Sequence, residues 1–122
     1  MIELDLTLVR AHLKADAIDA EDDLLTQYVE SAVSICEDYC NRNFYEDDAE
    51  LDAAWLEGIG DLEAAEAAYA EIASDDDFSD ATKAAARDRY IERQGTACRK
   101  ANGKVATPTV RAAILMTVGH LY

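Results

Sequence analysis

Three cysteines and two histidines are the side chains of this chain best suited to binding a metal or acting as a nucleophile. Cys36 and Cys40 are four residues apart, which places both thiols on one side of a helix. A zinc site would need further ligands from Cys98, His12 and His120. Structural zinc sites commonly use cysteines two residues apart in turns, so the spacing favours buried, packed thiols over a metal site. We therefore expect no metal and no cofactor, free thiols in a reducing compartment, and an ordinary surface or half-packed role for His12.

Acidic side chains are far more numerous, with 26 Asp and Glu in 122 residues. The cluster Asp19, Glu21, Asp22 and Asp23 is dense enough to suggest calcium. A calcium loop of the EF-hand type needs a central glycine and a terminal glutamate, whereas this cluster has no glycine and runs directly into an apolar pattern. Capping of a helix N-terminus accounts for it better. Because carboxylate pairs are common by chance here, and neither a Gly-x-Ser-x-Gly motif nor a phosphate-binding glycine loop occurs, we predict that the protein is not an enzyme.

The charges are unevenly distributed along the chain. Residues 1–45 hold 10 acidic and 3 basic side chains, residues 46–80 hold 14 acidic and no basic ones, and residues 81–122 hold 2 acidic and 8 basic ones. The net charge of −15 argues against a nucleic-acid clamp, because such a surface repels phosphate. The acidic middle and the basic last third could attract each other, either between neighbouring copies or within one copy.

The first half of the chain predicts two helices. Thr7 is a plausible N-cap for a short helix that ends near Lys14. Asp19 is expected to cap a second helix from about Ala20 to Asn41. The apolar side of this second helix repeats at helical spacing, with Leu24 and Ile35 at its margin. Its predicted members are Leu25, Tyr28, Val29, Ala32, Val33, Cys36, Tyr39 and Cys40.

The acidic middle predicts further short helices and no alternating strand pattern. One helix carries Leu51, Trp55, Leu56 and Ile59 and should be broken by Gly58 and Gly60. Asp61 should cap the next, with Leu62, Ala65, Tyr69 and Ile72 on its apolar side. Asp75–Asp77 is a break, and Ser79 should cap a helix to about Gln94 or beyond, with Gly95 weakening its continuation. Asn102–Gly103 is a stop signal, and an extended segment before Thr107 is compatible with the pattern.

The last 16 residues, Thr107–Tyr122, predict a helix that is apolar on most of its circumference. Thr107 suits the N-cap, and Pro108, the only proline, suits the first helical position. Such a helix must be covered on most sides and is too short to span a membrane. We expect it to pack against the stripe from Leu25 to Cys40, in the centre of the domain or shared with another subunit.

Two segments together resemble the small head–tail connector proteins of tailed bacteriophages, also called head-completion or adaptor proteins. The first is L-T-L-V-R-A-H-L-K-A-D, from Leu6 to Asp16, followed by the acidic connector and the long helix ending D-Y-C-N-R-N-F at Phe44. The second is the closing A-T-P-T-V-R-A-A-I-L-M-T-V-G-H-L-Y. The matching positions are Thr7, Ala11, His12, Leu13, Lys14, Asp22, Asp23, Tyr39, Asn41, Pro108, Ile114, Leu115, His120 and Tyr122. The order and spacing of these elements, over about Leu4–Phe44 and Thr107–Tyr122, carry the resemblance. The long acidic insertion, about residues 46–103, departs from the family pattern.

The residue patterns predict an all-α fold, a small helical bundle with a long amphipathic helix, an acidic helical insertion and an apolar C-terminal helix. With the resemblance, we expect a single head–tail connector domain over residues 1–122. The resemblance implies a structural virion protein of the capsid vertex, or neck, assembled in the host cytoplasm. Such proteins form a dodecameric ring between the portal protein and a tail terminator, stopper or next connector. DNA passes through the ring without specific binding, and no membrane is involved. We expect the partner interface to include Arg111, His120, Leu121 and Tyr122.

Two alternatives stay open at this stage. The block from Glu46 to Asp80 also suits an acidic helical interaction module, such as a DNA mimic that binds a basic partner. The second alternative is a small enzyme or metal protein built around Cys36, Cys40 and His120.

Overall fold

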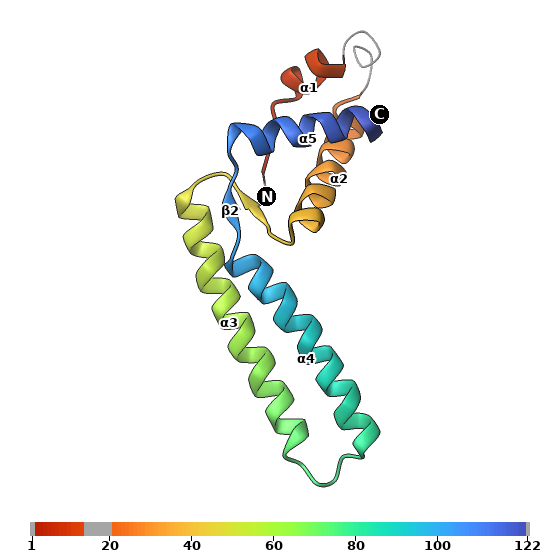
Figure 1. Cartoon of the computed structure of the whole chain (residues 1–122), viewed down its shortest axis with the longest axis vertical. Coiled ribbons are helices and arrows are strands. Elements are labelled where there is room, and N and C mark those ends of the chain that lie inside the picture. The colour runs from red at the N-terminus through yellow and green to blue at the C-terminus, as the bar shows by residue number, and fades with distance from the viewer. Residues whose placement is uncertain (1, 14–20, 122) are drawn as a thin grey trace. The chain divides into compact units, whose positions relative to one another are not determined.

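A computed structural model describes residues 2–13 and 21–121 of the chain, and this part is all-α apart from two very short strands. The chain divides into two compact units (Figure 1). The first comprises Met1–Asp48 and Lys104–Tyr122, and the second comprises Ala49–Gly103. The second unit thus covers nearly the residues of the expected acidic insertion. None of the described helices is long and apolar enough to cross a membrane.

The first unit contains helices α1 (Leu6–Leu13), α2 (Asp22–Cys40) and α5 (Pro108–Leu121). Helix α5 packs mainly against α2 and also contacts α1, as expected for the closing helix (Figure 1). Burial of aliphatic side chains between these helices and the N-terminal segment provides the main driving force for folding. The core consists of Ile2, Val9, Leu25, Val29, Ala32, Val33, Phe44, Ile114 and Val118.

Strands β1 (Phe44–Tyr45) and β2 (Lys104–Val105) pair in parallel in the same unit. Phe44 is opposite Lys104 and Tyr45 is opposite Val105. The backbone N–H of Ala106 also donates to the Tyr45 carbonyl at 2.8 Å. The second unit begins shortly after β1 and ends directly before β2, so this pairing holds together the two points at which the insertion leaves and rejoins the first unit.

The ends of the first unit's helices follow local chemistry, with one correction. Thr7 is not the N-cap of α1, because Asp5 Oδ1 accepts the Thr7 backbone N–H at 2.9 Å and therefore caps the helix. The expected cap Asp19 and the expected end at Lys14 lie outside the described residues. Helix α2 ends at Asn41, whose φ of 53° is a left-handed conformation that asparagine tolerates better than most residues.

The Thr107 cap and the Pro108 start of α5 are confirmed. Thr107 Oγ1 accepts the Val110 backbone N–H at 3.3 Å, and Pro108 is the first helical residue. Coverage of this helix is incomplete within the chain. Ile114 and Val118 are fully buried, whereas Met116 is 64% exposed.

Helix α2 corrects another expectation. Leu25, Val29, Ala32 and Val33 are buried as predicted, but Tyr39 is 91% exposed and Cys40 is exposed as well. These last two residues belong to the final turn of the helix, where the Phe44 segment fills the core instead.

The second unit is a hairpin of two antiparallel helices, α3 (Asp48–Ala73) and α4 (Asp80–Ala101), as Figure 1 shows. The expected break at Gly58 and Gly60 is wrong, because α3 continues through both, and α4 likewise continues through Gly95. Gly58 has a tertiary role: a Cβ there would lie 2.9 Å from Ala101 Cβ and from the Ala97 carbonyl oxygen. The missing side chain lets the two helices approach closely.

The ends of the hairpin helices match the sequence signals. Ser79 caps α4, since its hydroxyl accepts the Thr82 backbone N–H at 3.2 Å. Helix α4 ends at Asn102, and residues 74–79 form the turn where the three aspartates predicted a break. The buried residues of this unit are all small: Ala54, Gly58, Ala65 and Ala97.

Candidate interaction surface

The first unit leaves several large apolar side chains of α2 and α5 in contact with water. Leu24 and Ile35 are 43% and 47% exposed, and Tyr39 and Met116 are more exposed still. Single exposed apolar residues are normal, but a group of them on adjoining helices indicates a surface that binds another molecule.

The helical repeat places these α2 residues on one side of the helix. Leu24 and Ile35 each precede a residue of the predicted core stripe by one position, so they lie about 100° around the helix from it, and Tyr39 follows Ile35 by one turn on the same flank. Residues on the other flank face the N-terminal segment: Thr26 and Glu30 line a hollow together with Ile2 and Leu4. The three apolar side chains therefore lie on the side of α2 away from the N-terminal segment.

The same reasoning applies to α5. Arg111 contacts the N-terminal segment by donating to the Glu3 carbonyl oxygen at 3.3 Å. Ala113, Met116 and His120 point away from that flank, since they lie more than about 120° around the helix from Arg111. All three side chains are exposed.

A polar contact joins the two helices. Cys36 Sγ of α2 and Thr117 Oγ1 of α5 are 3.6 Å apart. We use the name α2–α5 face for a set of exposed side chains on these two helices. It consists of Leu24, Ile35 and Tyr39 from α2 and Ala113, Met116 and His120 from α5.

The opposite side of the unit is closed by a polar contact among three residues. Arg111 Nη2 lies 2.7 Å from Glu46 Oε2, and the other Glu46 oxygen accepts the Glu3 backbone N–H. The Glu3 N–H and the Arg111 guanidinium both favour the ionised carboxylate, so the pKa of Glu46 is lowered. This contact fixes the N-terminal segment to the first turn of α5.

The residues predicted for a partner interface are separated by the structure. Arg111 lies in the contact with Glu3 and Glu46, about one-third exposed. His120 is exposed on the α2–α5 face, and Leu121 is 37% exposed at the end of α5. Tyr122 lies outside the described residues. Their role in binding a partner stays a prediction.

The sequence interpretation missed Tyr39 and Met116, the two most exposed large apolar residues of this face. The signal was available in α2, where Leu24, Tyr28, Ile35 and Tyr39 form a second stripe at helical spacing beside the core stripe. In α5 the apolar run was too continuous to show which residues would stay exposed.

The thiols are not gathered into a site. Cys36 is half-buried, Cys40 is exposed, and Cys98 belongs to the second unit. Within residues 2–13 and 21–121, no group of three or more His, Cys, Asp or Glu side chains is placed to hold a metal ion.

Comparison with known proteins gives no relative for this chain: no family model, no curated protein and no solved structure matches it.

Proposed function

We propose that this protein is a structural component of a tailed bacteriophage particle, an adaptor that assembles into a ring between the portal protein and the tail or next connector. One observation carries the proposal. The two segments that resemble head–tail connectors, Leu4–Phe44 and Thr107–Tyr122, are separated by more than half of the described chain, yet their helices pack into one unit with a shared core. The insertion that departs from the family pattern, about residues 46–103, corresponds closely to the second unit, Ala49–Gly103.

The α2–α5 face supports a role in assembly. A ring subunit needs two different surfaces that join neighbouring copies, and each surface needs apolar area that a single copy leaves open. Met116 of α5 and Tyr39 of α2 supply such area. The net charge of −15 also suits a channel through which DNA slides, because it disfavours tight binding of phosphate.

The test is native mass spectrometry of the full chain, alone and mixed with a portal protein from the same genome. We expect a closed ring of many copies in at least one of the two samples. The variant Met116→Glu places a charge on the α2–α5 face and should weaken the ring. Thr26→Glu adds the same charge on the flank of α2 that faces the N-terminal segment and serves as the matched control. A chain that stays monomeric and does not bind portal would overturn the proposal.

The alternative of an acidic module draws on α3, which carries eight acidic residues and no basic one. It predicts a monomer that binds a basic nucleic-acid-binding protein and releases it in modest salt. The same experiment therefore separates the two functions, since the alternative requires no ring.

A further inference from the structure

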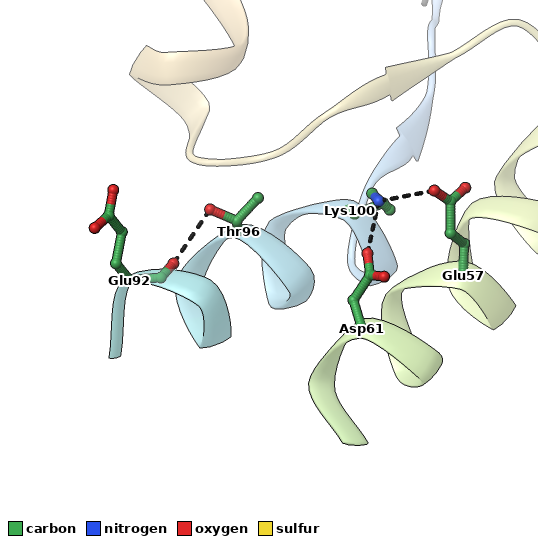
Figure 2. A network of polar contacts seen from close by, with 5 residues as sticks. All are labelled: Glu57, Asp61, Glu92, Thr96 and Lys100. Atoms are coloured by element: carbon green, nitrogen blue, oxygen red, sulfur yellow. Dashed lines mark hydrogen bonds and ion pairs between the residues drawn. The ribbon is translucent and has the colours of Figure 1, made fainter. Parts of the chain in front are cut away.

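The hairpin of the second unit satisfies only part of its opposite charges internally. Helix α4 carries six basic and three acidic residues, against the wholly acidic α3. Lys100 Nζ donates to Asp61 at 2.7 Å and to Glu57 at 3.0 Å, as Figure 2 shows. These two carboxylates raise the pKa of Lys100. This network shows that a basic side chain on this face of α4 binds carboxylates of an acidic helix.

Two arginines extend this face of α4 without partners. Arg89 and Arg93 precede Lys100 by eleven and seven residues, so all three lie on one side of the helix. Neither arginine forms an ion pair or a side-chain hydrogen bond with any residue that the structure describes. Acidic residues outnumber basic ones in this chain, 26 to 11. Two neighbouring guanidinium groups that form no ion pair among the described residues are therefore available to bind carboxylates of another molecule.

The arginines border a small apolar hollow between the two helices. Its volume is about 120 Å³, and its walls include Ala65, Ala68, Ala86 and Ile72. Tyr69 and Tyr90 stack beside it, with ring centroids 5.2 Å apart. We call Arg89, Arg93 and this hollow the arginine face. An apolar hollow next to bidentate donors suits a helix that presents carboxylates around small or apolar side chains.

Helix α3 itself has such a surface on the side away from α4. Glu63 and Glu71 are two turns apart, exposed, and unpaired among the described residues, with Ala67 between them. They lie about 140° around the helix from Gly58, which marks the contact with α4, so they cannot reach the arginines of their own copy.

We infer that the arginine face of one copy binds the Glu63–Glu71 surface of α3 in a second copy. The inference rests on the proposed ring and names a contact within it. The contact is heterologous, since each copy uses its α4 arginines toward one neighbour and its α3 carboxylates toward the other. Such a contact repeats around a ring and can close it. Bidentate arginine–carboxylate pairs between copies would extend the chemistry already seen at Lys100.

Charge reversal on each side gives the test. Variant A is Arg89→Glu with Arg93→Glu, and variant B is Glu63→Arg with Glu71→Arg. Native mass spectrometry and sedimentation at low salt should show a loss of association by about a hundredfold or more for A alone and for B alone, because like charges then meet. An equimolar mixture should recover the ring with A and B alternating, because each contact again joins opposite charges.

Two controls keep the result interpretable. Arg87→Glu makes the same charge change on the other side of α4 and should leave the ring intact. Circular dichroism checks folding, and the neutral pair Arg89→Gln with Arg93→Gln replaces variant A if A loses helicity. If variants A and B each still form rings like those of the wild type, this contact is overturned, whereas the proposed function still stands. A wild-type chain that never associates, with or without portal, would overturn both.

Discussion

Gly58 offers a direct test of the hairpin packing. Replacing it with alanine adds one methyl group, which would lie 2.9 Å from Ala101 Cβ and 2.9 Å from the Ala97 carbonyl oxygen. A backbone oxygen cannot rotate away as a flexible side chain can, so the helices must move apart. Gly60 and Gly95 are matched controls, because a Cβ at either position meets no atom within 4 Å.

The expected magnitudes follow from two opposing effects. In an exposed helix, alanine is more favourable than glycine by about 1 kcal/mol. Gly60→Ala and Gly95→Ala should each raise the free energy of unfolding of the hairpin by about that amount. Overpacking at Gly58 costs about 1–3 kcal/mol, so Gly58→Ala should be neutral or destabilising by up to about 2 kcal/mol.

Urea denaturation measures these differences. The only tryptophan, Trp55, lies in α3 one turn before Gly58, so its fluorescence reports on the second unit. Circular dichroism reports on all helices, and both should be recorded at a concentration where the chain is monomeric. If Gly58→Ala stabilises the protein as much as Gly60→Ala, the close approach of α3 and α4 at this position is refuted.

Two further predictions concern Glu46, at the start of the insertion, and Ser79, in the turn between α3 and α4. Glu46→Gln should lower the free energy of unfolding at neutral pH by at most about 1 kcal/mol, since the Glu46–Arg111 pair is about one-third exposed and screened by water. Folding lowers the pKa of Glu46, so its contribution to the free energy of unfolding is present above the usual glutamate pKa of 4.5 and is lost as the pH falls through the folded-state value. The free energies of unfolding of wild type and variant should therefore converge in acid. A difference between them that persists at low pH would contradict the ionic origin. Ser79→Ala should destabilise the hairpin by about 1 kcal/mol through loss of the cap, measured by the Trp55 signal, and an unchanged midpoint would show that the cap contributes nothing.

Much of the local structure was predictable from short-range chemistry. The caps Thr107 and Ser79, the proline start of α5 and the stop at Asn102 all act within one helical turn. The core stripe of α2 was predictable for the same reason, since a buried helix face repeats every three to four residues. The exception at Thr7 arose because Asp5, two residues earlier, offers an equally good cap.

The errors in the hairpin and in α2 have a tertiary origin. Glycine weakens an isolated helix, so Gly58 predicted a break, yet its missing side chain is what allows α3 to approach α4. Tyr39 has an apolar ring at a stripe position, but the chain after Asn41 turns back and Phe44 fills the core in its place.

The candidate surface was only partly visible beforehand. The excess apolarity of the closing helix indicated that something must cover it. Which residues stay open depends on where α1, α2 and the N-terminal segment pack, and this leaves Met116 exposed while Ile114 is buried. Arg111 could not be assigned to the inner contact from sequence, because its partners Glu3 and Glu46 lie 108 and 65 residues away.

The sequence by itself determined that the chain is helical, where α4 and α5 begin, and that acidic and basic charge are segregated along it. These properties depend on neighbouring residues and on composition. Only the tertiary structure decided that the acidic and basic segments meet as α3 and α4 of one hairpin, that Lys100 uses Glu57 and Asp61, and that Arg89 and Arg93 keep no partner among the described residues. The physical reason is that pairing and exposure depend on which helix faces approach each other, and that is set by packing between residues far apart in the chain.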